Sequence, residues 1–146
     1  MRKPPVLYIT RRVKFCAAHR LHNPALSPEE NRRIFGVCEN PNGHGHNYTL
    51  DVTVRGEVPA RTGMVMDLKV LKDLLEEHVV SALDHKHLNH DVESLKGTIP
   101  TAENVAIRVW EIVESALEGC ELYRVRLLES DENFVDYYGP EGRPRD

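Results

Sequence analysis

The segment Cys38-Glu-Asn-Pro-Asn-Gly-His-Gly-His-Asn-Tyr48 places a thiol and two histidines, two residues apart, directly before an alternating apolar and polar run. That run, Tyr48-Thr-Leu-Asp-Val-Thr-Val-Arg55, predicts a β-strand that ends at about Glu57. Side chains two residues apart in a strand share a face. If the extended backbone begins two or three residues before Tyr48, His44 and His46 therefore lie on one face.

Two imidazoles on one face of a strand form two adjacent ligands of a tetrahedral metal site. A third ligand is available from His19, at the end of a second predicted strand in which Val13, Phe15 and Ala17 alternate with other residues. Three neutral nitrogen ligands with an open fourth position are typical of catalytic zinc, whereas structural zinc closes that position, commonly with cysteine. The spacing predicts one Zn²⁺ per subunit, bound by His19, His44 and His46.

Cys38 separates two interpretations of this site. If its sulfur binds the metal, the site is a closed Cys-His₃ centre with a structural role. If the sulfur stays free, a thiolate beside Zn²⁺ and a histidine can act as a base or a nucleophile. The spacing of the residues leaves both interpretations open.

Asp84 and His85 open a polar segment that follows a predicted helix. A histidine beside a carboxylate can relay a proton, but adjacent residues seldom face one another. Spacing alone favours a solvated loop at this position.

Glu129 has the same parity as Val125 and Leu127 in a predicted strand, so its carboxylate points to an apolar face and needs a partner. That partner is a basic residue of another subunit or a ligand that offers two parallel N–H donors. Thr101 and Glu103 suit a helix cap and a charge in the first helical turn.

The composition describes a single globular domain, 1–146, in which 1–5 and 140–146 are expected to be frayed. Apolar residues make up 40% and charged residues 29%, which argues against disorder. A net charge of −4 gives no sign of a nucleic-acid or membrane partner. The start of the chain lacks the apolar core of a secretory signal, and three cysteines at unrelated spacings form no disulfide framework. We therefore expect a reduced, cytoplasmic protein.

Periodicity predicts an α+β fold with the element order ββααββ. The expected product is a four-stranded antiparallel sheet with two helices on one face. Valine and leucine on the other face of the sheet would favour assembly with other subunits. The expected elements are strands over 6–18 and up to 57, a helical turn over 27–30, helices over 67–83 and from 101 to about 117, an irregular segment over 84–99, and a hairpin of 122–129 with 134–138.

Six ordered blocks resemble the 6-pyruvoyl-tetrahydropterin synthase family, which has the tunnelling fold and also includes the 6-carboxy-tetrahydropterin synthases. The similarity extends from about Val13 to Gly139. The blocks are Phe-Cys-Ala-Ala-His-Arg-Leu (15–21), Phe-Gly-Val-Cys-Glu-Asn-Pro-Asn-Gly-His-Gly-His-Asn-Tyr (35–48), Thr-Gly-Met-Val-Met-Asp-Leu (62–68), Leu-Asp-His-Lys-His-Leu (83–88), Pro-Thr-Ala-Glu-Asn-Val-Ala (100–106) and Leu-Glu-Ser-Asp (128–131).

The resemblance implies a role for each candidate residue and an assembly for the chain. Zn²⁺ would be bound by the three histidines, and Cys38 would be the catalytic base. Asp84 and His85 would complete a proton relay with Cys38. Glu129 would anchor the pterin, with Thr101 and Glu103 as further substrate-binding residues. The family forms trimers that pair into a homohexameric barrel, with active sites between subunits.

The implied reaction converts 7,8-dihydroneopterin triphosphate to 6-pyruvoyl-tetrahydropterin in tetrahydrobiopterin biosynthesis. Triphosphate is released with the help of Mg²⁺, so the enzyme would be a carbon–oxygen lyase acting on phosphates. Lys14, Arg20 and Arg12 are candidate contacts of the triphosphate.

Three alternatives stay open. Relatives that form 6-carboxy-tetrahydropterin for queuosine tend to have a shorter gap between the cysteine and His-Gly-His, whereas here five residues separate Cys38 from His44. Other relatives use a glutamate in this loop to form 6-hydroxymethyl-dihydropterin for folate, and Glu39 keeps that activity open although we expect it to be a solvated loop charge. A pterin- or zinc-binding oligomer without activity is the non-enzyme alternative.

Overall fold

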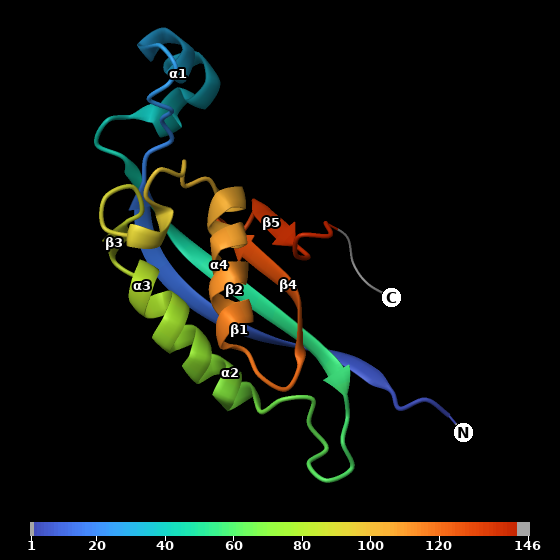
Figure 1. The fold of residues 1–146 in the computed structure, drawn as a ribbon. Helices are drawn as coiled ribbons and strands as arrows, with labels where there is room; N and C mark the ends of the chain where they lie inside the picture. The colour runs from blue at the N-terminus through green and yellow to red at the C-terminus, as the bar shows by residue number, and fades with distance from the viewer. Residues whose placement is uncertain (1, 143–146) are drawn as a thin grey trace.

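Two long antiparallel strands form the centre of the fold (Figure 1). In the computed structural model, which describes residues 2–142, β1 (Val6–His19) pairs with β2 (His44–Glu57) along its whole length. The register runs from Val6 opposite Glu57 to His19 opposite His44. Both strands confirm the alternation in the sequence, and β2 begins four residues before Tyr48, so the extended backbone includes both histidines of the His-x-His pair.

The sheet has five strands in the order β3-β1-β2-β4-β5. β4 (Glu121–Leu128) and β5 (Phe134–Tyr137) form the predicted hairpin, and β4 pairs antiparallel with β2. The prediction of a four-stranded antiparallel sheet was wrong, because β3 (Lys86–His87) adds a parallel strand beside β1 and makes the sheet mixed. A strand of two residues has no periodicity to detect.

Helical residues cover one face of the sheet, as predicted. α2 (Leu68–Leu75), the π-helical turn η2 (Glu76–Val80) and α3 (Ser81–Leu83) form one continuous helical run that packs on β1. The carboxylate of Asp67 caps this run by accepting the Lys69 N–H at 2.9 Å. α4 (Ala102–Ala116) packs on β4 and β5, and Figure 1 shows α2 and α4 on the same side of the sheet. The Thr101 hydroxyl caps α4 by accepting the Asn104 N–H at 3.2 Å.

The connection between β1 and β2 contains more helix than the predicted turn at 27–30. Ser27 caps α1 (Pro28–Phe35), which continues into the short 3₁₀ helix η1 (Gly36–Glu39). The side chain of Asn31 is fully buried and donates to the carbonyls of Asn23, Leu26 and Ser27, while its oxygen accepts the Asn23 N–H. These bonds tie α1 to the preceding loop, which explains a helix that periodicity does not predict.

The apolar core lies between the helices and the sheet. Val13 and Phe15 of β1 and Leu50, Val52 and Val54 of β2 are almost fully buried on this face. They occupy alternate positions, so the remaining positions of each strand face away from the helices.

The opposite face of the sheet is polar, so the predicted apolar second face was wrong. The Arg12 guanidinium binds the Asp51 carboxylate through two hydrogen bonds of 2.7 and 3.0 Å. Arg126 and Asp136 form a similar bidentate pair at 2.6 and 2.9 Å. The valines and leucines of β2 and β4 are taken up by the core, which leaves threonine, arginine and aspartate at the alternate positions.

The predicted frayed ends are only partly within the described residues. Residues 2–5 have no regular secondary structure, whereas residues 1 and 143–146 lie outside the description. Among the described helices, none combines the length and apolar character needed to cross a membrane. The candidate site is thus carried by an α+β fold with a mixed sheet and helices on one face.

Candidate active site and metal centre

Three histidines meet where β1 ends and β2 begins. His19 pairs directly opposite His44 in the sheet, and His46 lies two residues further along β2 on the same face. The Nε2 atoms of His19 and His44 are 3.3 Å apart, and the ring centroids of the three side chains are 4.8 to 5.0 Å apart. One ligand nitrogen from each residue lies within 4.8 Å of the other two, so the predicted trio is brought together.

Gly43 allows this close start of β2. Its φ is 73°, in the left-handed region that favours glycine. A Cβ at this position would lie 2.9 Å from the carbonyl oxygen of His19 and 2.9 Å from Nε2 of His87. The absence of a side chain therefore lets the loop approach the end of β1 directly before the first histidine of β2.

Burial favours the neutral form, which is the form that binds metals, in two of the imidazoles. His19 is 1% exposed, and its Nδ1 lies 2.8 Å from the carbonyl oxygen of Pro100, which accepts the Nδ1 proton and leaves Nε2 as the ligand atom. Burial lowers the pKa of His19, against the opposing effect of the Pro100 carbonyl. Burial also lowers the pKa of His46, against the opposing charge of Glu129.

One buried nitrogen atom without a hydrogen bond is consistent with a metal ion at the trio. Nε2 of His46 is buried and forms no hydrogen bond within residues 2–142. Glu129 Oε1 lies 3.2 Å away, close enough for an ion pair but without hydrogen-bond geometry. A buried imidazole nitrogen without a donor or acceptor partner is costly, and a metal ion would satisfy it. The three histidines are thus consistent with a metal site.

Glu129 lies beside the trio, with its Oε1 3.2 Å from Nε2 of His46. It follows β4, and its backbone N–H donates to the Asn133 carbonyl at 3.0 Å across the hairpin. Its side chain is 25% exposed, so the carboxylate borders the metal site and is still accessible to a ligand.

Asp84 and His85 lie in a turn with the His85 side chain 79% exposed, as expected for a solvated loop, but the two side chains face one another, which was not expected of adjacent residues. His85 Nδ1 lies 2.9 Å from Asp84 Oδ2, and His85 has a φ of 59°, which is uncommon for a residue other than glycine. The other carboxylate oxygen accepts the Cys16 N–H at 2.9 Å and the Cys16 thiol at 3.6 Å. The Cys16 N–H, followed by His85, lowers the pKa of Asp84. The sequence did not predict this second cluster of Cys16, Asp84 and His85, because Cys16 and Asp84 are 68 residues apart.

Cys38 joins neither cluster within one protomer. It lies in η1, and its carbonyl accepts the Leu21 N–H at 2.8 Å. Among residues 2–142, its thiol forms no hydrogen bond with Asp84 or His85. The predicted relay of Cys38, Asp84 and His85 is therefore not assembled inside a single chain.

Thr101 and Glu103 occupy the first turn of α4. Thr101 caps the helix. It directly follows Pro100, whose carbonyl accepts a hydrogen bond from His19, so the start of α4 lies next to the histidine trio. Glu103 is exposed. The Pro100 carbonyl was missed because no sequence pattern marks a backbone oxygen as a histidine partner.

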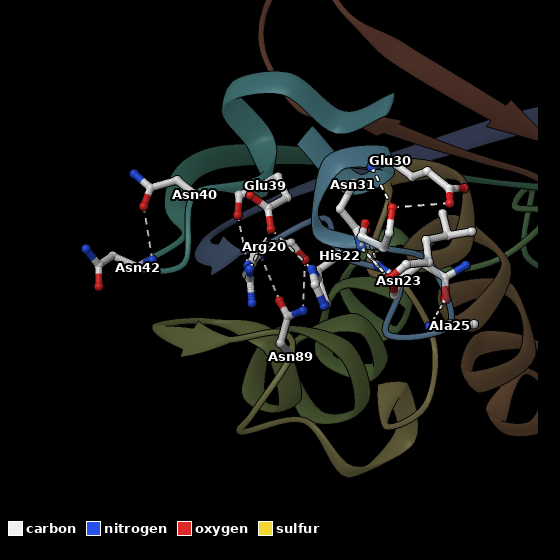
Figure 2. Close-up of polar contacts among 12 residues, drawn as sticks. Arg20, His22, Asn23, Ala25, Glu30, Asn31, Glu39, Asn40, Asn42 and Asn89 are labelled. Carbon is white, nitrogen blue, oxygen red and sulfur yellow. Dashed lines mark hydrogen bonds and ion pairs between the residues drawn. The ribbon is translucent and has the colours of Figure 1, made fainter. Parts of the chain in front are cut away.

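Glu39 is not a solvated charge, contrary to the prediction. Its side chain is only 13% exposed and pairs with Arg20 at 2.7 Å and with His22 at 3.2 Å (Figure 2). Two of the candidate triphosphate contacts are also paired within the chain, since Arg20 binds Glu39 and Arg12 binds Asp51.

A cavity of about 490 Å³ borders both clusters. Its lining includes Cys16 and His85 from the Cys16–Asp84–His85 cluster and Gly45 and His46 from the start of β2. The arrangement offers three nitrogen ligands, a neighbouring carboxylate and a separate aspartate–histidine pair.

Comparison with known proteins gives consistent results along the chain. The sequence pattern of the family described as 6-pyruvoyl tetrahydropterin synthase matches residues 8–140. The 6-pyruvoyl tetrahydrobiopterin synthase of Drosophila melanogaster is 45% identical over 141 residues, which cover 96% of this chain and 84% of the relative. The human 6-pyruvoyl tetrahydrobiopterin synthase is 47% identical over 131 residues, 90% of each chain.

A solved structure of Caenorhabditis elegans 6-pyruvoyl tetrahydropterin synthase has the same fold. It superposes with a TM-score of 0.90 at 44% identity, and the match covers 95% of this chain and 99% of the other. Together with the sequence matches, this shows that the chain belongs to the 6-pyruvoyl tetrahydropterin synthase family.

Proposed function

We propose that this chain is a 6-pyruvoyl tetrahydropterin synthase, a carbon–oxygen lyase that acts on phosphates. It converts 7,8-dihydroneopterin triphosphate to 6-pyruvoyl-tetrahydropterin and releases triphosphate, a step of tetrahydrobiopterin biosynthesis. The observation that carries the proposal is the histidine trio with its unpartnered His46 nitrogen, beside the carboxylate of Glu129, in a chain that matches such synthases along nine-tenths of its length.

The proposed metal is Zn²⁺, held by His19, His44 and His46. Three neutral nitrogen ligands favour zinc and leave one position for the substrate. When bound, Zn²⁺ would supply Lewis acidity toward the side-chain hydroxyls of the substrate. The Pro100 carbonyl orients the His19 ring for this role, as partners behind metal ligands commonly do. Mg²⁺ is proposed to accompany the triphosphate.

Glu129 is the proposed anchor of the pterin ring. Its two carboxylate oxygens can accept the 2-amino group and the neighbouring ring N–H as a parallel pair of hydrogen bonds. The carboxylate is 3.2 Å from His46, so a pterin bound by Glu129 would lie beside the metal ligands. Thr101 and Glu103 are proposed to line the same pocket.

Cys38 is the proposed base that removes a carbon-bound proton of the side chain. Triphosphate then leaves from the adjacent carbon, and tautomerisation moves two electrons from the side chain into the dihydropterin ring. The ring becomes tetrahydropterin while the side chain becomes a dicarbonyl, so no external oxidant or reductant is consumed. Asp84 and His85 are proposed to exchange protons with the reacting side chain.

We propose that the complete site forms between subunits of a homohexamer built from two trimers. Cys38 makes no hydrogen bond with Asp84 or His85 within one chain, so a neighbouring subunit would bring them together. The outer part of β1 supports assembly, because Val6, Leu7 and Tyr8 are 42 to 45% exposed. The proposed location is the cytoplasm, where the thiol of Cys38 stays reduced.

The reaction product tests this proposal. Purified zinc-loaded protein is incubated with 7,8-dihydroneopterin triphosphate and Mg²⁺, and the pterins are identified by mass spectrometry. We expect 6-pyruvoyl-tetrahydropterin and an equal amount of triphosphate. Formation of 6-carboxy-tetrahydropterin or 6-hydroxymethyl-dihydropterin would assign the chain to another reaction of the same substrate. Pterin binding without turnover would overturn the enzyme assignment.

A further inference from the structure

We propose that Glu39 is a positioning residue that fixes Cys38 relative to the metal site. It acts through the Glu39 cluster, which consists of Glu39, Arg20, His22 and Asn89. The inference rests on the proposed function, because it assumes that Cys38 is the base.

Arg20 holds residue 39 at two points. Its Nη2 donates to the Glu39 carboxylate at 2.7 Å, and its Nε donates to the Glu39 carbonyl at 2.9 Å (Figure 2). His22 Nδ1 lies 3.2 Å from the same carboxylate oxygen. One guanidinium therefore fixes both the main chain and the side chain of the residue next to Cys38.

Arg20 is itself fixed by a reciprocal pair of hydrogen bonds. Its backbone N–H donates to Asn89 Oδ1 at 2.8 Å, and Asn89 Nδ2 donates to the Arg20 carbonyl at 2.8 Å. The next residue, Leu21, donates its N–H to the Cys38 carbonyl at 2.8 Å. The carbonyls of residues 38 and 39 are thus both bound to the segment that directly follows the metal ligand His19.

On the other side of Glu39, residues 40–43 form local turns. Asn42 N–H donates to Asn40 Oδ1 at 3.1 Å, and Gly43 N–H donates to the Asn40 carbonyl at 2.8 Å. Together with the Leu21 bond, the Glu39 cluster therefore connects η1 to the residues that follow β1 next to His19. A shift of about 1 Å in a reacting group can cost about 10²-fold in rate, so this connection matters for a base in η1.

The same contacts explain why Glu39 is not the base itself. Burial raises the pKa of Glu39, but the hydrogen bonds from Arg20 and His22 outweigh it, so the net pKa is lowered. The carboxylate stays ionised and is paired with a guanidinium that is only 26% exposed. A charge-paired carboxylate of lowered pKa is a weak proton acceptor.

Three variants test the proposal by steady-state kinetics. In Glu39→Ala, both contacts of the carboxylate are lost, and we expect kcat to fall about 10²-fold with KM changed less than about twofold. In Glu39→Gln, kcat should fall less than in Glu39→Ala, because the amide oxygen can still accept a hydrogen bond from Arg20. Glu29→Gln removes one negative charge from an exposed position of α1 and should leave kcat unchanged.

A reciprocal variant identifies the partner. Arg20→Gln should lower kcat to the level of Glu39→Ala. The double variant Arg20→Gln/Glu39→Ala should have nearly the same kcat as either single variant, because the two residues act as one unit. If the fold-losses in kcat of the two single variants multiplied in the double variant, the proposal would be contradicted. Equal inactivation of Glu39→Gln and Glu39→Ala, with Arg20→Gln active, would show that Glu39 is the base and would also overturn it.

A second readout does not depend on turnover. The rate at which iodoacetamide alkylates Cys38 is followed by peptide mass spectrometry, which separates it from Cys16 and Cys120. We expect faster alkylation in Glu39→Ala than in Glu39→Gln, and the wild-type rate in Glu29→Gln. If the wild type forms no pyruvoyl product, the proposed function fails but the alkylation rates still test the positioning role. Wild-type alkylation and kcat in Glu39→Ala would overturn the inference.

Discussion

Replacing His19 by alanine is expected to abolish metal binding and, with it, turnover. His19 contributes a buried neutral nitrogen, and its ring is oriented by the Pro100 carbonyl 2.8 Å away. Loss of a group that hydrogen-bonds to a metal ligand typically lowers metal affinity about 10- to 100-fold. Loss of the ligand itself should lower metal affinity by about 10²-fold or more. Zinc content after dialysis against a chelator should fall from about one ion per protomer to near zero, as measured by mass spectrometry of the metal.

His78→Ala provides the matched control. His78 lies in η2 and its side chain is 45% exposed, so this variant should keep its zinc. Bound metal also stabilises the fold, by about 2.7 kcal/mol when free zinc exceeds its dissociation constant about 100-fold. A chelator should therefore lower the Tm of the wild type and of His78→Ala but leave that of His19→Ala unchanged. Full zinc content in His19→Ala would rule out the trio as the metal site.

Replacing Cys38 by alanine is expected to lower kcat about 10²- to 10⁴-fold, the contribution typical of a positioned general base. The zinc content should stay at the wild-type level, because in the proposed site three histidines hold the metal and the thiol is not a ligand. The two measurements are made on the same preparation, so loss of activity can be separated from loss of metal.

Cys120→Ala is the control for the thiol. Its sulfur lies 3.7 Å from the Met66 sulfur, away from the candidate site, and burial raises its pKa. This variant should keep both zinc and turnover. If Cys38→Ala lost its zinc as well as its activity, the sulfur would be a metal ligand and the closed structural site would be favoured instead.

Long periodic segments made most of the fold predictable. The alternation in β1 and β2, the helical spacing after Asp67 and the cap at Thr101 each extend over enough residues for one pattern to dominate. The histidine trio was predictable for the same reason, because strand parity places His44 and His46 on one face and an end-to-end pairing of β1 with β2 brings His19 to them.

Short or tertiary features were not predictable. β3 has two residues, and the residues on either side of it donate hydrogen bonds to β1, from His85 N–H to the Cys16 carbonyl and from Leu88 N–H to the Ala18 carbonyl. α1 depends on the buried amide of Asn31. Both features depend on residues distant in sequence or on backbone carbonyls, and a local sequence pattern specifies neither.

The errors within the site have a common cause. Arg20 and Glu39 are 19 residues apart without a periodic relation, so their ion pair depends on the path of the loop between β1 and β2. Likewise, the contact between Asp84 and His85 occurs with His85 in a left-handed conformation, which residue type does not specify. The polar second face, by contrast, follows from the alternation of β2, where Asp51 and Thr53 separate the buried leucine and valines.

X-ray absorption spectroscopy of the zinc-loaded protein tests the central claim most directly, because it reports the atoms bound to the metal. If His19, His44 and His46 hold zinc and leave Cys38 free, the spectrum should fit nitrogen or oxygen neighbours at about 2.0 Å alone. A sulfur neighbour at about 2.3 Å would place the Cys38 thiol on the metal and contradict its role as the base.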